Sequence, residues 1–178
     1  MSVLNSTASI QIVINEIRAS PKLSQLLRRI CAAEIKKKPL IMPFHSMSTT
    51  IGNTIYLARD FFDWKRKEQA ENLCHECIHL QQFDKMGVNA FISAYAQKAG
   101  RLRLEQEAYK TSIAWWIACG EIGSPNLYGS DTVFAASNLR IARIINALLS
   151  KYFFGSFVSE AQLIAWAAAT VRELMAES

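Results

Sequence analysis

Apolar residues recur at intervals of three and four along most of this 178-residue chain. Such spacing puts the apolar side chains on one face of a helix, and it therefore predicts a mainly helical protein. Prolines and glycines divide the pattern into segments, because both interrupt helices. The predicted helices cover residues 9–18, 22–36, 65–86, 89–99, 101–119, 131–150 and 159–176.

The ends of these helices carry further signals. The second helix is predicted to stop before Pro39, with Lys36 to Lys38 as its solvated basic end beside the negative end of the helix dipole. Gly87 and Gly100 are expected to end two later helices, since glycine favours the position just after a helix. Ser159 opens the last helix with a capping-box pattern, because a glutamine follows it by three residues.

One stretch predicts sheet rather than helix. The sequence "TTIGNTIYLA", residues 49–58, has β-branched and aromatic residues on both sides of a Gly-Asn pair, which favours a hairpin. The two prolines in residues 39–44 favour an extended segment. With 51% hydrophobic and 20% charged residues, the chain is apolar enough to fold as a single domain over residues 1–178. We therefore predict an α+β, mostly helical fold with a small sheet that contains residues 50–58.

Charge and segment length narrow the expected partners and location. The net charge is +5, but the dense basic cluster at Lys36 to Lys38 has no nucleic-acid-reading motif beside it, so no nucleic-acid partner is expected. Apolar stretches such as "LIAWAAATV" are shorter than the roughly 20 residues of a membrane span. The first residues lack the basic and apolar pattern of a signal peptide. We expect a chain made in the cytoplasm with no membrane span, while a place in a virion or export by another route stays open.

The segment "NLCHECIHLQQ", residues 72–82, contains an H-E-x-x-H motif within a predicted helix. His75 and His79 are four residues apart, so about 40° separates them around the helix axis and both imidazoles leave the same face. That spacing suits two nitrogen ligands of one metal ion. Glu76 is turned about 100° from His75 and can serve as a general base beside the ion. The motif predicts a zinc-hydrolase site, with a purely structural helix as the alternative.

A catalytic zinc ion usually has three protein ligands, so one more must be found. The metzincin continuation fails, because Gln82 and Lys85 stand where a glycine and the third histidine are required. Glu105 and Glu107, in "RLRLEQEAYK", are the candidates. Glu105 lies at the edge of the apolar stripe of its helix, and Glu107 points nearly opposite, toward solvent. An inward carboxylate needs a cation or a donor, so Glu105 is the predicted ligand, with a salt bridge to an arginine as the alternative and Glu107 as the alternative ligand.

Cys74 and Cys77 form a C-x-x-C pair interleaved with the histidines. A structural zinc site needs four ligands, and the other two cysteines, Cys31 and Cys119, are isolated, so an all-cysteine site is the weaker hypothesis. Both thiols of the pair fall on the side of the helix away from the histidines. They are predicted to be small buried hydrophobes. The third histidine, His45, either borders the site or is an ordinary loop residue.

With these residues in place, the sequence resembles the gluzincins, zinc peptidases in which a glutamate on a later helix joins the two HExxH histidines. It is similar to small zincin-like metallopeptidases of bacteria and phages, in which HExxHxxQ precedes an E-x-E-A-Y helix. Where gluzincins have an E-x-x-A pattern, the ligand is the glutamate three residues before the alanine, here Glu105. The similarity extends loosely over residues 50–110, since such proteins also place a strand like "NTIYLA" before the zinc helix, where it can bind an extended peptide. The matching residues are His75, Glu76, His79, Gln82, Glu105, Glu107, Ala108 and Tyr109.

Two features depart from the family pattern. Many gluzincins carry an aspartate four residues after the ligand glutamate, where it supports a histidine, and Tyr109 stands there instead. Such support is worth roughly 10- to 100-fold in metal affinity or activity. No histidine follows the motif to stabilise an oxyanion. Tyr109 and Tyr128 are the candidates for that role, and simple packing is the alternative for each.

The motif and the resemblance together imply a zinc-dependent metallopeptidase with a zincin-like fold, whose metal-site core spans about residues 45–110. Zn²⁺ would activate a water, and Glu76 would accept its proton and return it to the leaving amine of a peptide, protein or peptidoglycan substrate. The alternative is a catalytically inactive zincin-like module with a structural or interaction role, for example in a phage particle or a secretion assembly. The C-terminal helical part, residues 120–178, would then suit burial against a protein partner.

Overall fold

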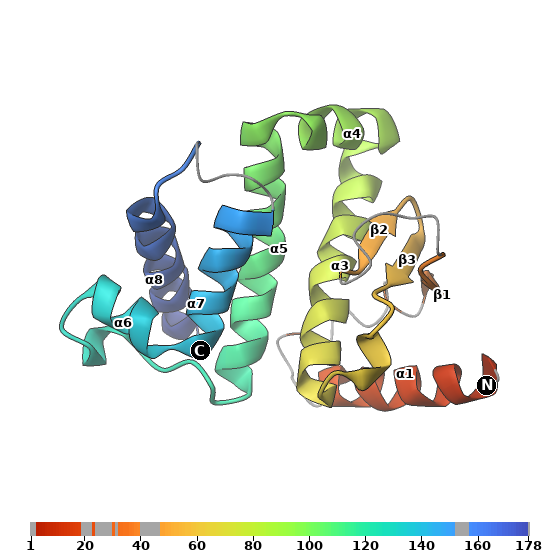
Figure 1. Ribbon diagram of the computed structural model, residues 1–178, viewed down its shortest axis with the longest axis horizontal. Helices are drawn as coiled ribbons and strands as arrows, with labels where there is room; N and C mark the ends of the chain where they lie inside the picture. Colours follow the sequence, from red (N-terminus) through yellow and green to blue (C-terminus); the bar gives the residue numbers. More distant parts are fainter. Residues whose placement is uncertain are drawn as a thin grey trace. The chain divides into compact units, whose positions relative to one another are not determined.

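Most of the chain is helical, and a small three-stranded sheet lies near its beginning. The computed structural model drawn in Figure 1 describes residues 3–18, 23, 30, 32–39, 47–151 and 157–177. The predicted α+β, mostly helical fold is confirmed at this level. The chain divides into two compact units, Met1–Phe91 and Ile92–Ser178, with the boundary inside helix α4 (Val88–Ala96).

The first unit combines the sheet with the long helix that carries the HExxH motif. Helix α1 (Val3–Arg18) comes first, and α3 (Arg66–Met86) follows the sheet and a short 3-10 helix, η1 (Phe61–Asp63). The strand order is β1-β3-β2, with β1 parallel and β2 antiparallel to β3. The strands are β1 (Glu34–Lys37), β2 (Thr49–Ile51) and β3 (Thr54–Leu57).

The hairpin predicted from residues 49–58 is confirmed. Strands β2 and β3 pair with Thr50 opposite Ile55. Gly52, in the turn between them, has a φ of 58°, a left-handed conformation that glycine adopts readily. Ile55 and Leu57 are buried, and β2 contacts α3. The hairpin thus places β2 directly against the helix of the motif.

The predicted helix over residues 22–36 is wrong at its end, because Glu34–Lys37 is strand β1. This segment pairs in parallel with β3, so its main-chain groups bond to a neighbouring strand rather than within a helix. The basic cluster is also divided, since its first two lysines are exposed whereas Lys38 is buried. Most of residues 22–31 and of the predicted extended segment 39–44 lies outside the described residues.

Helix α3 follows the sequence prediction closely, and Gly87 ends it. Gly87 has a φ of 78°, and its main-chain nitrogen donates to the carbonyl oxygen of Phe83 at 2.8 Å. Near the start of the helix, the side-chain amide of Gln69 donates to the carbonyl oxygen of Phe61 at 2.9 Å. Every residue from Leu73 to Leu80 is buried. The polar side chains of the motif therefore lie in the protein interior, where each needs a polar partner or a ligand.

The second unit is helical, and α8 (Glu160–Ala176) contacts three other α-helices and one 3-10 helix of the unit. The capping box of Ser159 with Gln162 at the start of α8 is confirmed. The other elements of the unit are α5 (Lys98–Ala118), η2 (Pro125–Leu127), α6 (Asp131–Ser137), α7 (Leu139–Asn146) and the π-helical turn η3 (Ala147–Lys151).

Two predicted helix boundaries in this unit are wrong. The break between α4 and α5 falls at Gln97, and Gly100 lies inside α5. A Cβ added at Gly100 would stand 2.3 Å from the carbonyl oxygen of Ala94, so glycine is required there by close packing rather than by a helix end. The predicted helix over residues 131–150 is divided at Asn138, whose side chain caps α7 by accepting two main-chain N–H groups of its first turn.

Polar and aromatic contacts link helices of the second unit. The Arg140 guanidinium lies 3.7 Å from the centre of the Trp116 ring, and its Nε donates to Glu121 at 2.8 Å. Arg172 of α8 forms an ion pair with Asp131 at the start of α6. The first set of contacts joins α7 to α5, and the ion pair joins α8 to α6.

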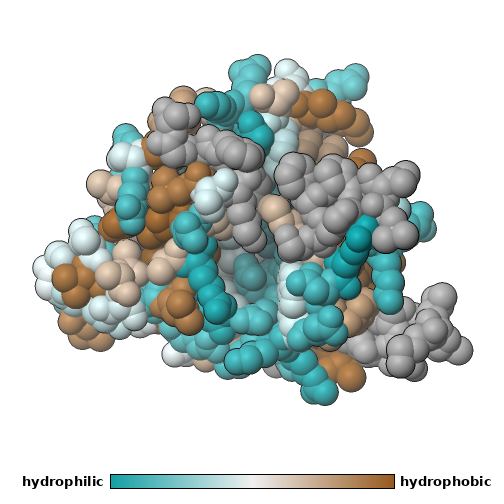
Figure 2. Space-filling view, viewed as in Figure 1, coloured by the Kyte–Doolittle hydropathy of each residue, from teal (hydrophilic) through white to brown (hydrophobic). Residues whose placement is uncertain are grey.

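Several large hydrophobic side chains of the second unit are exposed. Leu127, Val133 and Leu139 are 80%, 50% and 63% exposed, and they belong to η2, α6 and α7. Figure 2 shows brown, hydrophobic residues among teal, hydrophilic ones on the visible face. Single exposed apolar side chains are common on the surfaces of folded proteins.

The sequence predicts no membrane span, because its apolar stretches are shorter than a bilayer requires. Among the described residues, no single helix combines the length and the apolar character needed to cross a membrane. The segments Asp131–Ser137 and Leu139–Ser150 meet the length and composition test only as a pair, and that pair is bent by 98°.

Candidate metal centre

Helix α3 presents both HExxH histidines side by side. The ring centres of His75 and His79 are 5.0 Å apart, and the ring planes are inclined by 77°. Both side chains are buried, with exposed fractions of 5% and 6%. Helix geometry accounts for the arrangement, because four residues make just over one turn. The two imidazoles are thus neighbours in the protein interior.

Gln82 fixes the orientation of His79. The side-chain oxygen Oε1 of Gln82 lies 2.8 Å from Nδ1 of His79, and Gln82 is itself buried. An amide oxygen only accepts hydrogen bonds, so Nδ1 of the neutral ring carries the proton and donates. The lone pair of Nε2 then points outward from the pair and can bind a metal ion. Gln82 thus holds His79 in one orientation from within the same helix.

Aromatic side chains form an apolar wall on one side of His79. The Phe91 ring centre lies 6.2 Å from that of His79, and Phe91 stacks on Phe83 at 3.9 Å. Phe83 and Phe91 are themselves buried, so apolar side chains cover this side of the His79 ring.

Glu76 points toward the sheet and is held by a strand residue. The hydroxyl of Thr50, on β2, donates to Oε2 of Glu76 at 2.7 Å. Thr50 Oγ1 also lies 3.2 Å from the main-chain oxygen of Glu76. Both residues are buried. The carboxylate next to the histidines is thus fixed in position by a charge-assisted hydrogen bond.

A buried lysine is hydrogen-bonded to the segment that leads into this strand. Lys38 is 5% exposed, and its Nζ donates to the carbonyl oxygen of Met47 at 2.6 Å and to Oγ1 of Thr49 at 2.7 Å. Burial lowers the pKa of Lys38, and the negative charge of Glu76 partly opposes this by raising it. The two charges are therefore close enough to interact.

In the second unit, Glu105 is an inward carboxylate of α5. It is fully buried, whereas Glu107 is exposed, which confirms the directions that the apolar stripe of this helix predicts. The hydroxyl of Tyr95 donates to Oε1 of Glu105 at 2.7 Å. The guanidinium of Arg101 lies 5.7 Å from the centre of the Tyr95 ring. The Tyr95 hydroxyl thus holds one oxygen of this carboxylate.

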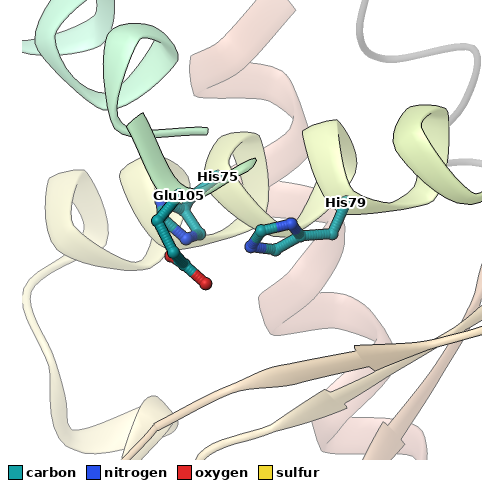
Figure 3. Close-up of side chains that lie close together, drawn as sticks. All are labelled: His75, His79 and Glu105. Carbon is teal, nitrogen blue, oxygen red and sulfur yellow. The ribbon is translucent and has the colours of Figure 1, made fainter. Parts of the chain in front are cut away.

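His75, His79 and Glu105 form a group that could hold a metal ion. Each offers one ligand atom, and these atoms all lie within 4.8 Å of one another. Figure 3 shows the three side chains close together, with both histidines extending from α3. Two imidazole nitrogens and one carboxylate oxygen are a ligand set that Zn²⁺ accepts.

Other candidate residues from the sequence have different surroundings. The Tyr128 ring packs on Phe134, with 5.4 Å between ring centres and an inclination of 61°. Tyr109 is half-buried on α5. Their suggested role in stabilising an oxyanion stays a prediction. Cys74 and Cys77 are fully buried thiols, as expected of small apolar residues.

Sequence reasoning missed the contacts of three polar residues, namely Thr50, Lys38 and Tyr95. Thr50 was visible only as a β-branched strand residue, and Lys38 as one of three consecutive lysines. Tyr95 carried no signal, because its partner lies on the next helix. His45 and Cys31 lie outside the described residues.

Comparison with known proteins does not assign this chain to a family. It matches no family model, and no curated protein or solved structure is significantly similar to it. The function is therefore argued from the motif and its surroundings.

Proposed function

We propose that this protein is a zincin-like, zinc-dependent peptidase in which His75, His79 and Glu105 bind the metal and Glu76 is the general base. The observation that carries the proposal is the buried group of three ligand atoms within 4.8 Å of one another. Two imidazoles from one helix face and an inward carboxylate are the ligand types that zinc takes in hydrolases.

The residues present fit a zinc ion in their chemistry. Zinc in hydrolases commonly has three nitrogen or oxygen ligands from the protein and keeps a fourth position for water or substrate. The hydrogen bond from His79 to Gln82 sets the tautomer that such a ligand needs. Tyr95 orients the carboxylate of Glu105. Both supports resemble the outer hydrogen bonds that steady metal ligands elsewhere.

The chemistry then follows from the position of Glu76. When bound, zinc lowers the pKa of a water toward about 7 and polarises the substrate carbonyl. Thr50 occupies Oε2 of Glu76, so we assign Oε1 as the atom that accepts a proton from the attacking water. Glu76 passes the same proton to the nitrogen of the leaving amine, and the C–N bond breaks. The substrate class is a peptide or protein amide.

A second function is favoured by the exposed apolar residues of the second unit. Leu127, Val133 and Leu139 suit a protein partner, as expected of a catalytically inactive zincin-like interaction module. Such a module would bind zinc through the same ligands and would show no turnover.

One experiment separates these functions. Purified protein is stripped with a chelator and reloaded with zinc, the bound metal is counted per chain, and hydrolysis of labelled casein and of a quenched-peptide library is followed. We expect about one zinc per chain. Glu76→Gln should keep the zinc and lose turnover by a factor of roughly 10² to 10⁴. Glu71→Gln, on the same helix, is its control.

Ligand variants complete the test. Glu105→Gln should weaken zinc binding, whereas Glu107→Gln, which alters an exposed carboxylate of the same helix, should not. Absence of zinc from the wild-type protein would contradict both functions. Bound zinc without turnover of any substrate would favour the interaction module.

A further inference from the structure

Thr50 is the polar side chain that the sheet directs toward Glu76. Strand β2 contacts α3, and the Thr50 hydroxyl donates to Glu76 Oε2 at 2.7 Å. Thr50 is 8% exposed and Glu76 is 4% exposed. A hydrogen bond to a charged acceptor is stronger when both groups are removed from water. This contact therefore restricts the carboxylate to one orientation.

The same hydroxyl also lies close to the main chain of the motif. Its oxygen lies 3.2 Å from the main-chain oxygen of Glu76, and its single hydrogen is directed mainly to the nearer carboxylate. Strand β2 is thus hydrogen-bonded to the side chain of Glu76 and lies close to the main chain of the same residue. A movement of β2 would change the position of the carboxylate relative to the histidines on α3.

The segment that carries Thr50 is itself held at several points. Lys38 Nζ donates to the Met47 carbonyl and to Thr49 Oγ1, at 2.6 and 2.7 Å. The main-chain nitrogen of Ala58 donates to Oγ of Ser48 at 3.1 Å. Lys38 follows β1, and its own main-chain nitrogen donates to Leu57 of β3 at 3.1 Å. The lysine therefore connects the far strand of the sheet to the residues just before Thr50.

We propose that Thr50 is the positioning residue of the general base Glu76, and that buried Lys38 fixes the strand segment that carries it. This inference rests on the proposed function, because it gives Glu76 its catalytic role. Thr50 acts through Glu76 and holds Oε2, which leaves Oε1 directed to proton transfer. Lys38 acts one step further away, through Met47 and Thr49.

Kinetics of matched threonine variants test the proposal on the zinc-loaded full chain. Thr50→Val keeps the size of the side chain and removes the hydroxyl, so kcat should fall by roughly ten- to a hundredfold with KM nearly unchanged. Thr50→Ser restores the hydroxyl and should recover most of kcat. Thr54→Val makes the same change on β3, where Thr54 bonds to Glu34 at 3.2 Å, and should leave both constants unchanged. Lys38→Met should lower kcat less than Thr50→Val does.

A second readout is independent of turnover. Protein labelled with ¹³C at the glutamate Cδ is compared at one fixed pH, and the Glu76 signal is assigned by its loss in Glu76→Gln. Thr50→Val should shift this signal and Thr54→Val should not. Zinc content should stay at the wild-type level in the two Thr50 variants, in Thr54→Val and in Lys38→Met, because none of them removes a proposed ligand.

The outcomes distinguish the two proposals. If the wild-type protein has no turnover, or if Glu76→Gln retains it, the proposed function fails and the role of Thr50 falls with it. If Glu76→Gln is inactive but Thr50→Val has the kcat and the Cδ signal of the wild type, the role of Thr50 alone is overturned. Equal losses in Thr50→Val and Thr50→Ser would also overturn it, since they would reflect packing rather than the hydroxyl.

Discussion

At the scale of single residues, the support of His79 comes from its own helix. Gln82 lies three residues after His79, a spacing that puts the two side chains on neighbouring positions of one helix face. This contact could be anticipated from the HExxHxxQ spacing alone, because it needs no information about the rest of the fold. The partners of Glu76 and Glu105 could not, since Thr50 and Tyr95 come from other elements.

Removal of the Gln82 amide should weaken metal binding without removing a ligand. In Gln82→Leu, Nδ1 of His79 loses its acceptor, so neither the tautomer nor the ring orientation is fixed. We expect the zinc dissociation constant to rise roughly 10- to 100-fold, measured by competition with a chelator of known affinity. Gln81→Leu, at an exposed neighbouring position, should bind zinc like the wild type. Equal affinities in the two variants would show that the Gln82 contact does not support the site.

Lys38 shows the limit of reasoning from local sequence. Three consecutive lysines predict a solvated basic cluster, and two of the three are indeed exposed. Lys38 is buried because its ammonium donates to two acceptors, Met47 and Thr49, that belong to a later segment of the chain. No periodicity in the sequence indicates which lysine of the three has such acceptors.

The lowered pKa of Lys38 leads to a defined pH dependence of stability. Burial disfavours the charged ammonium, so the folded protein releases this proton at a lower pH than the unfolded chain, whose lysine has a pKa near 10.5. Between these two pKa values the unfolded state binds more protons, and the free energy of unfolding therefore rises with pH. Below the folded-state pKa, Lys38 is protonated in both states and does not make the free energy of unfolding depend on pH.

Urea unfolding of the wild type and of Lys38→Met, compared from pH 7 to about 10.5, checks this dependence. The stability difference in favour of the wild type should grow as pH rises, because the variant lacks the titrating group while the other lysines cancel. A difference that is constant or that shrinks over this range would mean that burial does not lower the pKa of Lys38.

At the scale of elements, the sequence predicts those features whose signals are local. The hairpin around Gly52, the end of α3 at Gly87 and the capping box at Ser159 each depend on residues within a few positions of one another. Strand β1 was mistaken for helix because its structure depends on pairing with β3, twenty residues later in the chain. The break at Asn138 has a local cap, but the apolar pattern continues through it and concealed the signal.

At the element scale, Gly100 was expected to end a helix, but it lies inside α5, where close packing requires glycine. Replacement by alanine would put a Cβ 2.3 Å from the carbonyl oxygen of Ala94, so the start of α5 or the end of α4 must shift. We expect Gly100→Ala to lower the free energy of unfolding by about 1–3 kcal/mol, measured in urea. Gly123→Ala is the matched control, because its added Cβ meets no atom within 4 Å, and it should change stability by about 0.5 kcal/mol or less. Similar values for both variants would remove the packing explanation.

At the scale of the whole molecule, the candidate site residues contribute several buried polar groups. His75, Glu76, His79, Gln82 and Glu105 are all buried, and such groups are stable only if hydrogen bonds or a ligand replace their contacts with water. The sequence indicated the first three through their spacing and Glu105 through the apolar stripe of its helix. A metal ion bound among them would therefore affect the stability of the protein as well as its activity.

Zinc should therefore stabilise the protein as a whole. A ligand that binds the folded state alone adds RT ln(1 + [L]/Kd), or about 2.7 kcal/mol when free zinc exceeds its Kd a hundredfold. For a chain of this size, that free energy corresponds to a rise of roughly 5–10 °C in Tm, measured by calorimetry with and without a chelator. Glu76→Gln should show the same rise, because Glu76 is not a proposed ligand, whereas His75→Ala and Glu105→Gln should show much less. A rise that persists in His75→Ala would place the stabilising ion elsewhere, and no rise in the wild type would mean that these buried groups are partnered without a metal.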